Sequence, residues 1–216
     1  MEFKPPPAII VADECWAFSR GISAILDSVD LLTEARVNSI ADCIQTTEQL
    51  SNPGNSLVIC GPHLPERPLF DFFRWLRCEK PDVKSILIST QAADRNFYLD
   101  VAANHVRACL PHGLQCEQIA QAIQDVLSGR VLFSTEELEQ AFRPIAITDA
   151  ERQVLQLMAD GLSYGKIAIK LVLSLNTVRN HANNIQAKLN VHDRDAAVAR
   201  AYRRGLLAVV GDIPGA

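Results

Sequence analysis

One stretch decides how the C-terminal third of the chain folds: Ser174-Leu-Asn-Thr-Val-Arg-Asn-His-Ala-Asn-Asn-Ile-Gln-Ala-Lys-Leu189. Four apolar residues recur in it at spacings of four, three and four, which predicts one apolar stripe along a helix: Val178, Ala182, Ile185 and Leu189. Ser174 stands where the N-cap of that helix belongs. The opposite face carries amides and cations, with no carboxylate between Ser174 and Asn190: Asn176, Arg179, Asn180, Asn183 and Lys188.

A shorter helix is predicted just upstream, where Ile167, Ala168 and Leu171 form an apolar face. Only Val172-Leu-Ser174 joins the two helices. A tight connection followed by a helix that presents cations and amides is what a helix-turn-helix reader of the DNA major groove needs. Arg and Lys suit phosphate and guanine, and Asn can pair with adenine or bond a phosphate. A polar helix face can also be merely solvated, so this helix alone does not decide between the two interpretations.

The residues around this helix resemble the LuxR/NarL-type DNA-binding domain. Residues 147–163 resemble its first helix and turn, and Lys166-Ile-Ala, residues 175–191 and residues 196–207 continue the resemblance without a gap. The match extends over the whole module and is far more specific than a lone helix-turn-helix pattern. It implies a four-helix, all-α domain over residues 147–210 that binds double-stranded DNA.

The resemblance also implies roles for individual residues. Arg179, Asn180 and Asn183 would face the bases, while Asn176, Thr177 and Lys188 would lie against phosphates. Arg179 could be bidentate to guanine or could only neutralise a phosphate, and we favour base readout. Lys166 stands where the module usually has Glu, and it adds a cation that could reach the DNA backbone. His181 matches the module and implies a packing or backbone contact.

The last predicted helix of this region, 195–204, carries small apolar residues that permit close helix approach: Ala196, Ala197, Val198 and Ala201. In the family this helix supplies the contact between two DNA-binding domains. The resemblance therefore implies a homodimer.

Charge is shared unevenly along the 216 residues, which are enough for one large or two ordinary domains. Residues 1–143 hold 12 Lys and Arg against 19 Asp and Glu, a net charge of −7. Residues 144–216 hold 9 against 6, a net charge of +3. Because nucleic acid attracts a basic surface, only the second region is expected to seek phosphate.

Other whole-chain signals indicate a cytoplasmic protein with no role at a membrane. No apolar run reaches the length of a membrane span, and the N-terminus lacks the long apolar core of a signal peptide. The six cysteines are scattered without a Cys-x-x-Cys pair, and the five histidines show no metal-ligand spacing. Free thiols are therefore expected rather than disulfides or a metal site.

The first region alternates apolar strands with amphipathic helices. Strands are predicted at Ala8–Ala12, Leu57–Cys60, Ser85–Ile88 and Val106–Leu110, with a weaker one near Asp30–Glu34. Strands that are apolar on both faces and alternate with helices predict a doubly wound, five-stranded parallel α/β sheet over residues 1–127. In such a sheet the functional crevice lies at the carboxyl ends of the strands. Residues 128–146 are predicted to form a linker with a short helix.

This arrangement resembles a response-regulator receiver domain, with its flavodoxin-like strand order. Asp13 and Glu14 match the acidic pair that holds Mg²⁺ in receivers, and Ser89 matches the switch residue. Gly61 occupies the position of the phosphorylated Asp, four residues before Pro65. Receivers have a Lys after the fifth strand. The corresponding position here is Pro111 or His112, and neither residue is Lys.

These departures predict a degenerate receiver that works without aspartyl phosphorylation. Glycine cannot accept a phosphoryl group, and the cation that would pair with phosphate is missing. Asp13 and Glu14 remain weak metal candidates, Mg²⁺ is not expected there, and no other cofactor is implied. His63 lies near this pocket and is interpreted as a solvated loop histidine.

Three alternatives accompany the interpretation as a regulator. The chain could be an interaction protein that sequesters or co-regulates another regulator without binding DNA tightly, and the front domain could serve a protein or small-ligand partner. An enzyme is not expected, because the sequence has no glycine-rich phosphate loop, nucleophile elbow or metal triad. A signal-binding front domain like that of quorum regulators is disfavoured by the strand–helix alternation.

Overall fold

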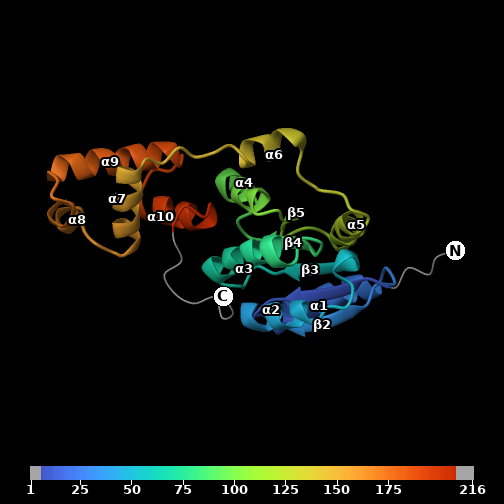
Figure 1. Ribbon diagram of the computed structural model, residues 1–216. Helices are drawn as coiled ribbons and strands as arrows, with labels where there is room; N and C mark the ends of the chain where they lie inside the picture. Colours follow the sequence, from blue (N-terminus) through green and yellow to red (C-terminus); the bar gives the residue numbers. More distant parts are fainter. Residues whose placement is uncertain (1–5, 208–216) are drawn as a thin grey trace. The chain divides into compact units, whose positions relative to one another are not determined.

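The computed structural model describes residues 6–207 (Figure 1). The chain divides into two compact units, residues 1–142 and residues 143–216. The last residues of the predicted DNA-binding domain, 208–210, lie outside the described part of the chain.

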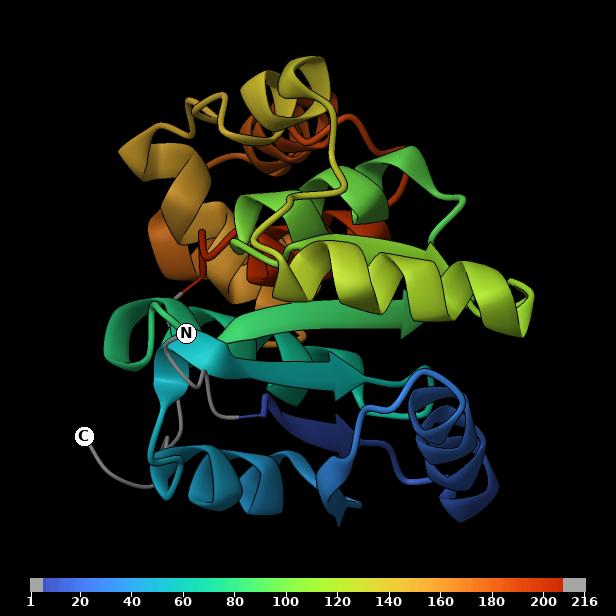
Figure 2. The same cartoon turned by 90° about the vertical axis from the view of Figure 1, so that its right-hand side faces the viewer.

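The first unit is built on five parallel strands in the order β2-β1-β3-β4-β5, as Figure 2 shows from one side. The strands are β1 (Ala8–Ala12), β2 (Thr33–Val37), β3 (Ser56–Cys60), β4 (Lys84–Ser89) and β5 (Ala108–Pro111). The order and direction confirm the predicted doubly wound, flavodoxin-like sheet. The weak strand expected near residues 30–34 lies slightly later, because this edge strand alternates between exposed and half-buried residues and has no apolar run.

Helices cover both faces of the sheet. They are α1 (Trp16–Asp27), α2 (Ile40–Glu48), α3 (Glu66–Glu79), α4 (Arg95–Ala103) and α5 (Cys116–Leu127), with a 3-10 turn, η1 (Pro53–Asn55). Alternate strand residues feed two separate cores. Ile10 and Val58 join the core that contains α2, α3 and α4, and Ile9 and Leu57 join the core that contains α1 and α5.

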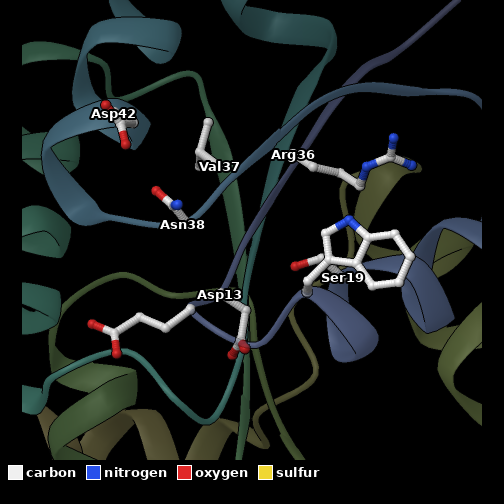
Figure 3. A pocket seen from close by; sticks show the side chains of 8 residues that line it. Asp13, Ser19, Arg36, Val37, Asn38 and Asp42 are labelled. Carbon is white, nitrogen blue, oxygen red and sulfur yellow. The ribbon is translucent and has the colours of Figure 1, made fainter.

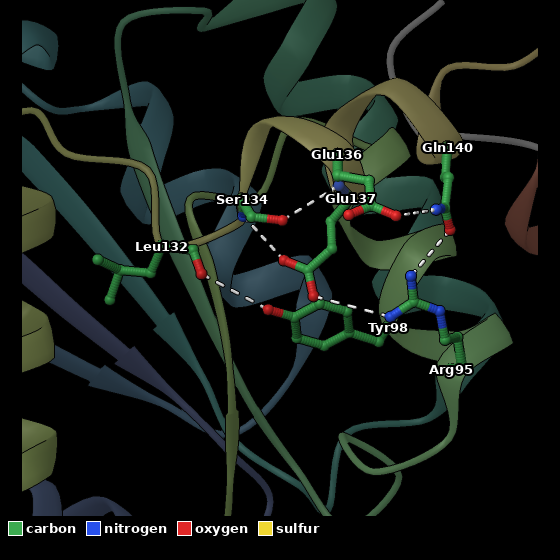
Figure 4. Close-up of polar contacts among 7 residues, drawn as sticks. All are labelled: Arg95, Tyr98, Leu132, Ser134, Glu136, Glu137 and Gln140. Carbon is green, nitrogen blue, oxygen red and sulfur yellow. Dashed lines mark hydrogen bonds and ion pairs between the residues drawn. The ribbon is translucent and has the colours of Figure 1, made fainter.

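The segment expected to be a linker is for the most part a piece of the first unit. Helix α6 (Thr135–Ala141) packs against α4, and Phe133 and Ala141 are buried in the core of α2, α3 and α4. The ring of Tyr98 lies 4.8 Å from that of Phe133. Arg95 donates to Gln140 at 2.8 Å, as Figure 4 shows. Burial raises the pKa of Tyr98 to about 12, with the charge of Glu137 as a further cause. The connection between the units therefore starts at Arg143.

Up to residue 207, the second unit consists of four helices around one core, as predicted. They are α7 (Asp149–Ala159), α8 (Tyr164–Leu171), α9 (Leu175–Lys188) and α10 (Arg194–Arg203). Thr148 and Glu151 form a capping box at the start of α7, and Gly161, at φ +80°, follows its end. None of the helices in residues 6–207 is long and apolar enough to cross a membrane.

Candidate nucleic-acid interface and the receiver-like pocket

The orientation of α9 is fixed by its cap and its apolar stripe. Ser174 caps the helix by accepting a hydrogen bond from the backbone N–H of Thr177 at 3.0 Å. The stripe of Val178, Ala182, Ile185 and Leu189 is buried in the core formed with α7 and α8. Because this face is held inward, the residues on the other side of the helix point to solvent.

The outward face of α9 carries unpaired hydrogen-bonding groups. Asn176, Arg179, Asn180 and Asn183 are all exposed and lie one turn apart or side by side on the helix. Within residues 6–207 none of their side chains has a hydrogen bond or an ion pair. A guanidinium offers five donors, and each carboxamide offers donors and an acceptor. This set can bond base edges and phosphate oxygens.

The cations of the second unit fall into two groups. Most of them form hydrogen bonds or ion pairs within the protein. Four arginines donate to backbone carbonyls: Arg152 to that of Leu206, Arg194 to that of Met158, Arg200 to that of Leu189 and Arg204 to that of Arg143. In the described part of the unit, Lys166, Lys170 and Arg179 have no partner for the side-chain charge, and all three are exposed on α8 or α9. Arg143, at the start of the unit, is a further exposed cation without a side-chain partner among these residues. The free positive charge is thus concentrated on the helix-turn-helix pair. The sequence analysis missed Lys170, although its place one turn after Lys166 was visible.

Lys188 differs from its expected role. It was expected to lie against phosphate, but its Nζ lies 2.6 Å from Oε2 of Glu151, whose side chain is 4% exposed. A buried carboxylate needs a paired cation, and Lys188 supplies it. Burial alone would raise the pKa of Glu151, but the hydrogen bonds from Lys188 and Thr148 and the charge of Lys188 together lower it.

The remaining expected DNA contacts have mixed surroundings. Thr177 is half-buried, and its hydroxyl lies 2.8 Å from that of Ser174 in the helix cap. His181 is half-buried on α9, and the side chain of Lys166 is exposed on α8. These positions leave Arg179 and the three asparagines as the groups that face outward without a partner.

At the carboxyl edge of the sheet, Asp13 is buried and held by three N–H groups. Its carboxylate accepts from the backbone N–H of Cys15 at 2.7 Å and of His63 at 3.0 Å, and Nδ1 of His63 lies 2.8 Å from Oδ1. His63 is an exposed residue of the loop after β3, as expected, with 52% of its side chain exposed, and its imidazole additionally lies against Asp13. No sequence signal joins these residues, because His63 lies fifty positions after Asp13.

The other pocket residues lie at the ends of their strands. Glu14 is exposed after β1, and Ser89 is buried at the end of β4, where its Oγ accepts from the N–H of Gln91 at 3.0 Å. His112 is exposed after β5, and its N–H donates to the carbonyl of Ser89 at 3.2 Å. The structure thus brings the ends of β1, β3, β4 and β5 to one edge, as a parallel sheet requires.

Gly61 has no room for a side chain. A Cβ at this position would lie 2.5 Å from Cε1 of Phe18 and 2.7 Å from Cγ of Asp13, well inside van der Waals contact, and would overlap Oδ2 of Asp13. The carboxylate of Asp13 and the ring of Phe18 therefore occupy the space where a residue-61 side chain would start.

Mg²⁺ does not fit the residues present. The ion requires near-octahedral oxygen ligands, usually including carboxylates, and several waters. Gly61 supplies no ligand, and the groups beside Asp13 are the thiol of Cys15 and the imidazole of His63 rather than further oxygens. Only Glu14 offers an exposed carboxylate at the position of the acidic pair.

A cavity of about 300 Å³ opens beside Asp13 (Figure 3). Its walls combine carboxylates, an amide, a guanidinium and an indole: Asp13, Glu14, Trp16, Ser19, Arg36, Val37, Asn38 and Asp42. Trp16 is 70% exposed on one side of it. The cavity is large enough for a small polar molecule or several waters.

Comparisons with known proteins agree with these geometries. Residues 146–201 match the family described as bacterial regulatory proteins, luxR family. The transcriptional regulatory protein DesR of Bacillus subtilis (strain 168) is 32% identical over 123 residues, which are 56% of this chain and 61% of that protein. A nitrate/nitrite response regulator protein homolog of Haemophilus influenzae is 26% identical over 208 residues, 91% of this chain and 96% of that protein.

Among solved structures, RcsB from Salmonella enterica serovar Typhimurium, bound to promoter P1flhDC in the presence of the phosphomimetic BeF3−, superposes with a TM-score of 0.71. The match covers 92% of this chain and 99% of that one at 16% identity, so it shows a shared fold.

Proposed function

We propose that this chain, a homologue of bacterial response regulators whose residues 146–201 belong to the luxR family, is a sequence-specific, dimeric DNA-binding transcriptional regulator. One observation carries the proposal. The unpaired cations of the helices α7 to α10, Lys166, Lys170 and Arg179, all lie on the helix-turn-helix pair, next to asparagines that have no protein partner. A helix of this kind inserts into the major groove, and phosphate contacts position it.

In this proposal Arg179, Asn180 and Asn183 read base edges, while Lys166, Lys170 and Asn176 lie against phosphates. Arg179 pairs with guanine, and each asparagine can make two hydrogen bonds to adenine. Thr177 contributes through the helix cap, and its hydroxyl can bond a phosphate. Lys188 has no part in DNA binding, because it neutralises Glu151.

Dimerisation is assigned to α10 and the surface around it. Ala196, Val198 and Ala199 of this helix are half-exposed, so small side chains are available for close contact with a second copy. A solved structure is described as two RcsB dimers bound to two parallel DNAs, and it shares this fold. A two-fold dimer would present two copies of α9 to two half-sites.

The first unit is proposed to act without aspartyl phosphorylation. Gly61 offers no acceptor atom, the space beside it is occupied by Asp13 and Phe18, and His112 rather than Lys follows β5. DNA binding would then depend on the amount of protein, or on another ligand of the first unit.

The first test is a set of binding isotherms on genomic fragments for three variants. Arg179→Ala and Asn183→Ala should each lose about 1–3 kcal/mol of discrimination between specific and unrelated DNA. Lys166→Ala should weaken binding to all sequences alike and reduce the salt dependence by about one phosphate. Arg130→Ala removes the same charge from the surface of the first unit and should change neither quantity. Unaltered binding by Arg179→Ala and Asn183→Ala together would refute the groove assignment.

The second test adds a phosphoryl donor with Mg²⁺ to the unmodified protein. The isotherm should not move, because no residue at position 61 can take the phosphoryl group. Binding that appears only with the donor would contradict the proposal and would direct attention to another acceptor.

A second candidate function is a protein-interaction role for the DNA-binding unit. Four large apolar residues are exposed at the junction of α8 and α9: Ile169 (82%), Val172 (90%), Leu173 (37%) and Leu175 (40%). A cluster of this kind is uncommon on a surface that only meets solvent or phosphate. If a partner protein covers it, Ile169→Lys should abolish co-purification of that partner while the free protein keeps its fold. If the substitution changes DNA binding alone, the cluster belongs to the DNA interface.

A further inference from the structure

Three side chains of different donor chemistry meet at the carboxyl edge of the sheet. Asp13 follows β1, Cys15 caps the start of α1, and His63 lies in the loop after β3. Because β1 and β3 are neighbours in parallel register, with Ala12 opposite Cys60, the two loops converge. One ligand atom from each of the three residues lies within 4.8 Å of the other two.

We propose that Asp13, Cys15 and His63 form a binding site for a divalent transition-metal ion, with zinc as the best match. An imidazole nitrogen, a thiolate and a carboxylate oxygen are ligands that zinc and its neighbours in the series accept, whereas Mg²⁺ takes oxygen. Three protein ligands leave a fourth, tetrahedral position for solvent. The half-exposed imidazole of His63 and the partly exposed Cys15 give the ion access from solvent.

The three residues are positioned by one another. Cys15 and His63 both donate their backbone N–H to the carboxylate of Asp13, so the two loops that carry the ligands are fastened to the third ligand. The edge of the Phe18 ring contacts the imidazole of His63, with ring centroids 6.1 Å apart. Ligand atoms around a tetrahedral zinc lie about 3.5 Å apart. The ligand atoms of the three residues all lie within 4.8 Å of one another, and Nδ1 of His63 lies 2.8 Å from Oδ1 of Asp13, so binding requires the side chains to rotate.

Gly61 is part of this arrangement. A side chain there would push against Asp13 and Phe18, so the carboxylate could not remain beside His63. The residue that removes the phosphoacceptor thus also makes room for the proposed ligand set.

The thiol of Cys15 is the proposed sulfur ligand at the carboxyl edge of the sheet. It has no side-chain hydrogen bond within the described part of the chain and is partly exposed. Cys43, Cys60 and Cys109 are buried, so these thiols are not exposed to an entering ion.

Cobalt(II) titration of the full-length protein tests the site, because cobalt replaces zinc and reports its ligands by absorption. The wild type should bind one equivalent and develop a near-ultraviolet thiolate-to-cobalt charge-transfer band, which zinc then removes. Cys15→Ser should lose that band. His63→Ala should weaken binding at least about tenfold, since even the loss of a supporting group costs this much at metal sites.

Cys116→Ser is the matched control. Cys116 is an exposed thiol of the same unit, at the start of α5, and lies outside the cluster, so its loss should leave the spectrum and the affinity unchanged. Gly61→Ala tests the coupling to position 61 and should weaken binding, with near-ultraviolet circular dichroism as the check on folding. The proposal is overturned if the wild type shows no saturable one-equivalent binding, or if the charge-transfer band persists in Cys15→Ser. Neither outcome bears on the DNA-binding variants of the second unit.

Discussion

Gly61 shows how a single residue without a side chain determines its surroundings. Its hydrogen atom lets the carboxylate of Asp13 and the ring of Phe18 close over the end of β3, and the carboxylate finds three N–H donors there. A larger residue at position 61 therefore requires Asp13 or Phe18 to move. A residue added at 61 has to displace a buried, fully hydrogen-bonded carboxylate.

The first prediction is that Gly61→Asp destabilises the first unit by about 1–3 kcal/mol, because the new side chain overpacks this corner. Denaturant unfolding followed by the fluorescence of Trp16 and Trp75, both in the first unit, measures the change. Gly21→Ala is the control. Gly21 lies in the interior of α1 with open space around it, so this substitution should stabilise the unit by about 0.5–1 kcal/mol. Equal stability of Gly61→Asp and wild type would refute the steric argument.

The Glu151–Lys188 pair gives the second prediction. The pKa of Glu151 is lowered in the folded protein, so the stability that its charge contributes is present above about pH 4.5 and is lost as the pH falls below that value. Glu151→Gln should lower the stability of the second unit at neutral pH by about 1–3 kcal/mol, because Lys188 loses its partner. The carboxamide can still accept from Thr148, so the capping box persists.

The measurement is the unfolding free energy of the second unit between neutral and acidic pH. The loss of stability on acidification should be shallower in Glu151→Gln than in the wild type. Asp160→Asn, an exposed position at the end of α7, should keep the wild-type slope. Parallel curves for Glu151→Gln and wild type would show that the pair contributes nothing to the acid response.

At the scale of elements, α6 is held in place by the buried ring of Phe133, two residues before the helix, rather than by charged side chains. Phe133 is 5% exposed and packs on Tyr98, whereas the pair of Arg95 and Glu137 is separated by 3.9 Å at a solvated surface. Burial of an aromatic ring contributes several kcal/mol, and an exposed ion pair contributes about 0–1 kcal/mol.

The third prediction compares these two anchors. Phe133→Ala should cost about 3–5 kcal/mol of the stability of the first unit and should speed hydrogen exchange across α6. Arg95→Ala should change the stability by no more than about 1 kcal/mol. If Arg95→Ala frees α6 and Phe133→Ala does not, polar contacts hold the helix and the assignment is reversed.

At the scale of the whole molecule, the two units carry opposite net charges, −7 and +3 for residues 1–143 and 144–216. Only the second attracts DNA, and most of its cations are used inside the protein. The salt response of DNA binding therefore reports on the few charges that remain free.

The fourth prediction is a shallow salt dependence. If each chain of a dimer places Lys166 and Lys170 against phosphates, four phosphates are neutralised and the logarithmic slope is about −4. Isotherms at a series of salt concentrations measure it. A slope steeper than about −7 would mean that cations here assigned to internal carbonyls or to Glu151 reach the DNA instead.

Both folds were predictable because their signals are local. Runs such as Ala8–Ala12 and Leu57–Cys60 identify buried parallel strands, and the stripe of Val178, Ala182 and Ile185 identifies the orientation of α9. The unpaired face of α9 follows from that orientation. The role of Lys188 could not be predicted in this way, because its partner Glu151 lies 37 residues earlier on another helix.

The sequence also could not predict that Asp13, Cys15 and His63 lie close together. Their proximity depends on the path of two loops, and no spacing in the sequence records it. The docking of α6 was hidden for a related reason. Val131-Leu-Phe133 is too short an apolar run to be assigned to a particular core from its pattern.

The crowded corner at position 61 has an evolutionary consequence. Some glycine and aspartate codons differ by one base, so an aspartate could enter this position by a single mutation. Its side chain would meet Asp13 and Phe18, and no lysine follows β5. Under the proposed function, such a variant would lose stability without gaining a phosphorylation site. The packing at this corner would therefore select for glycine at position 61.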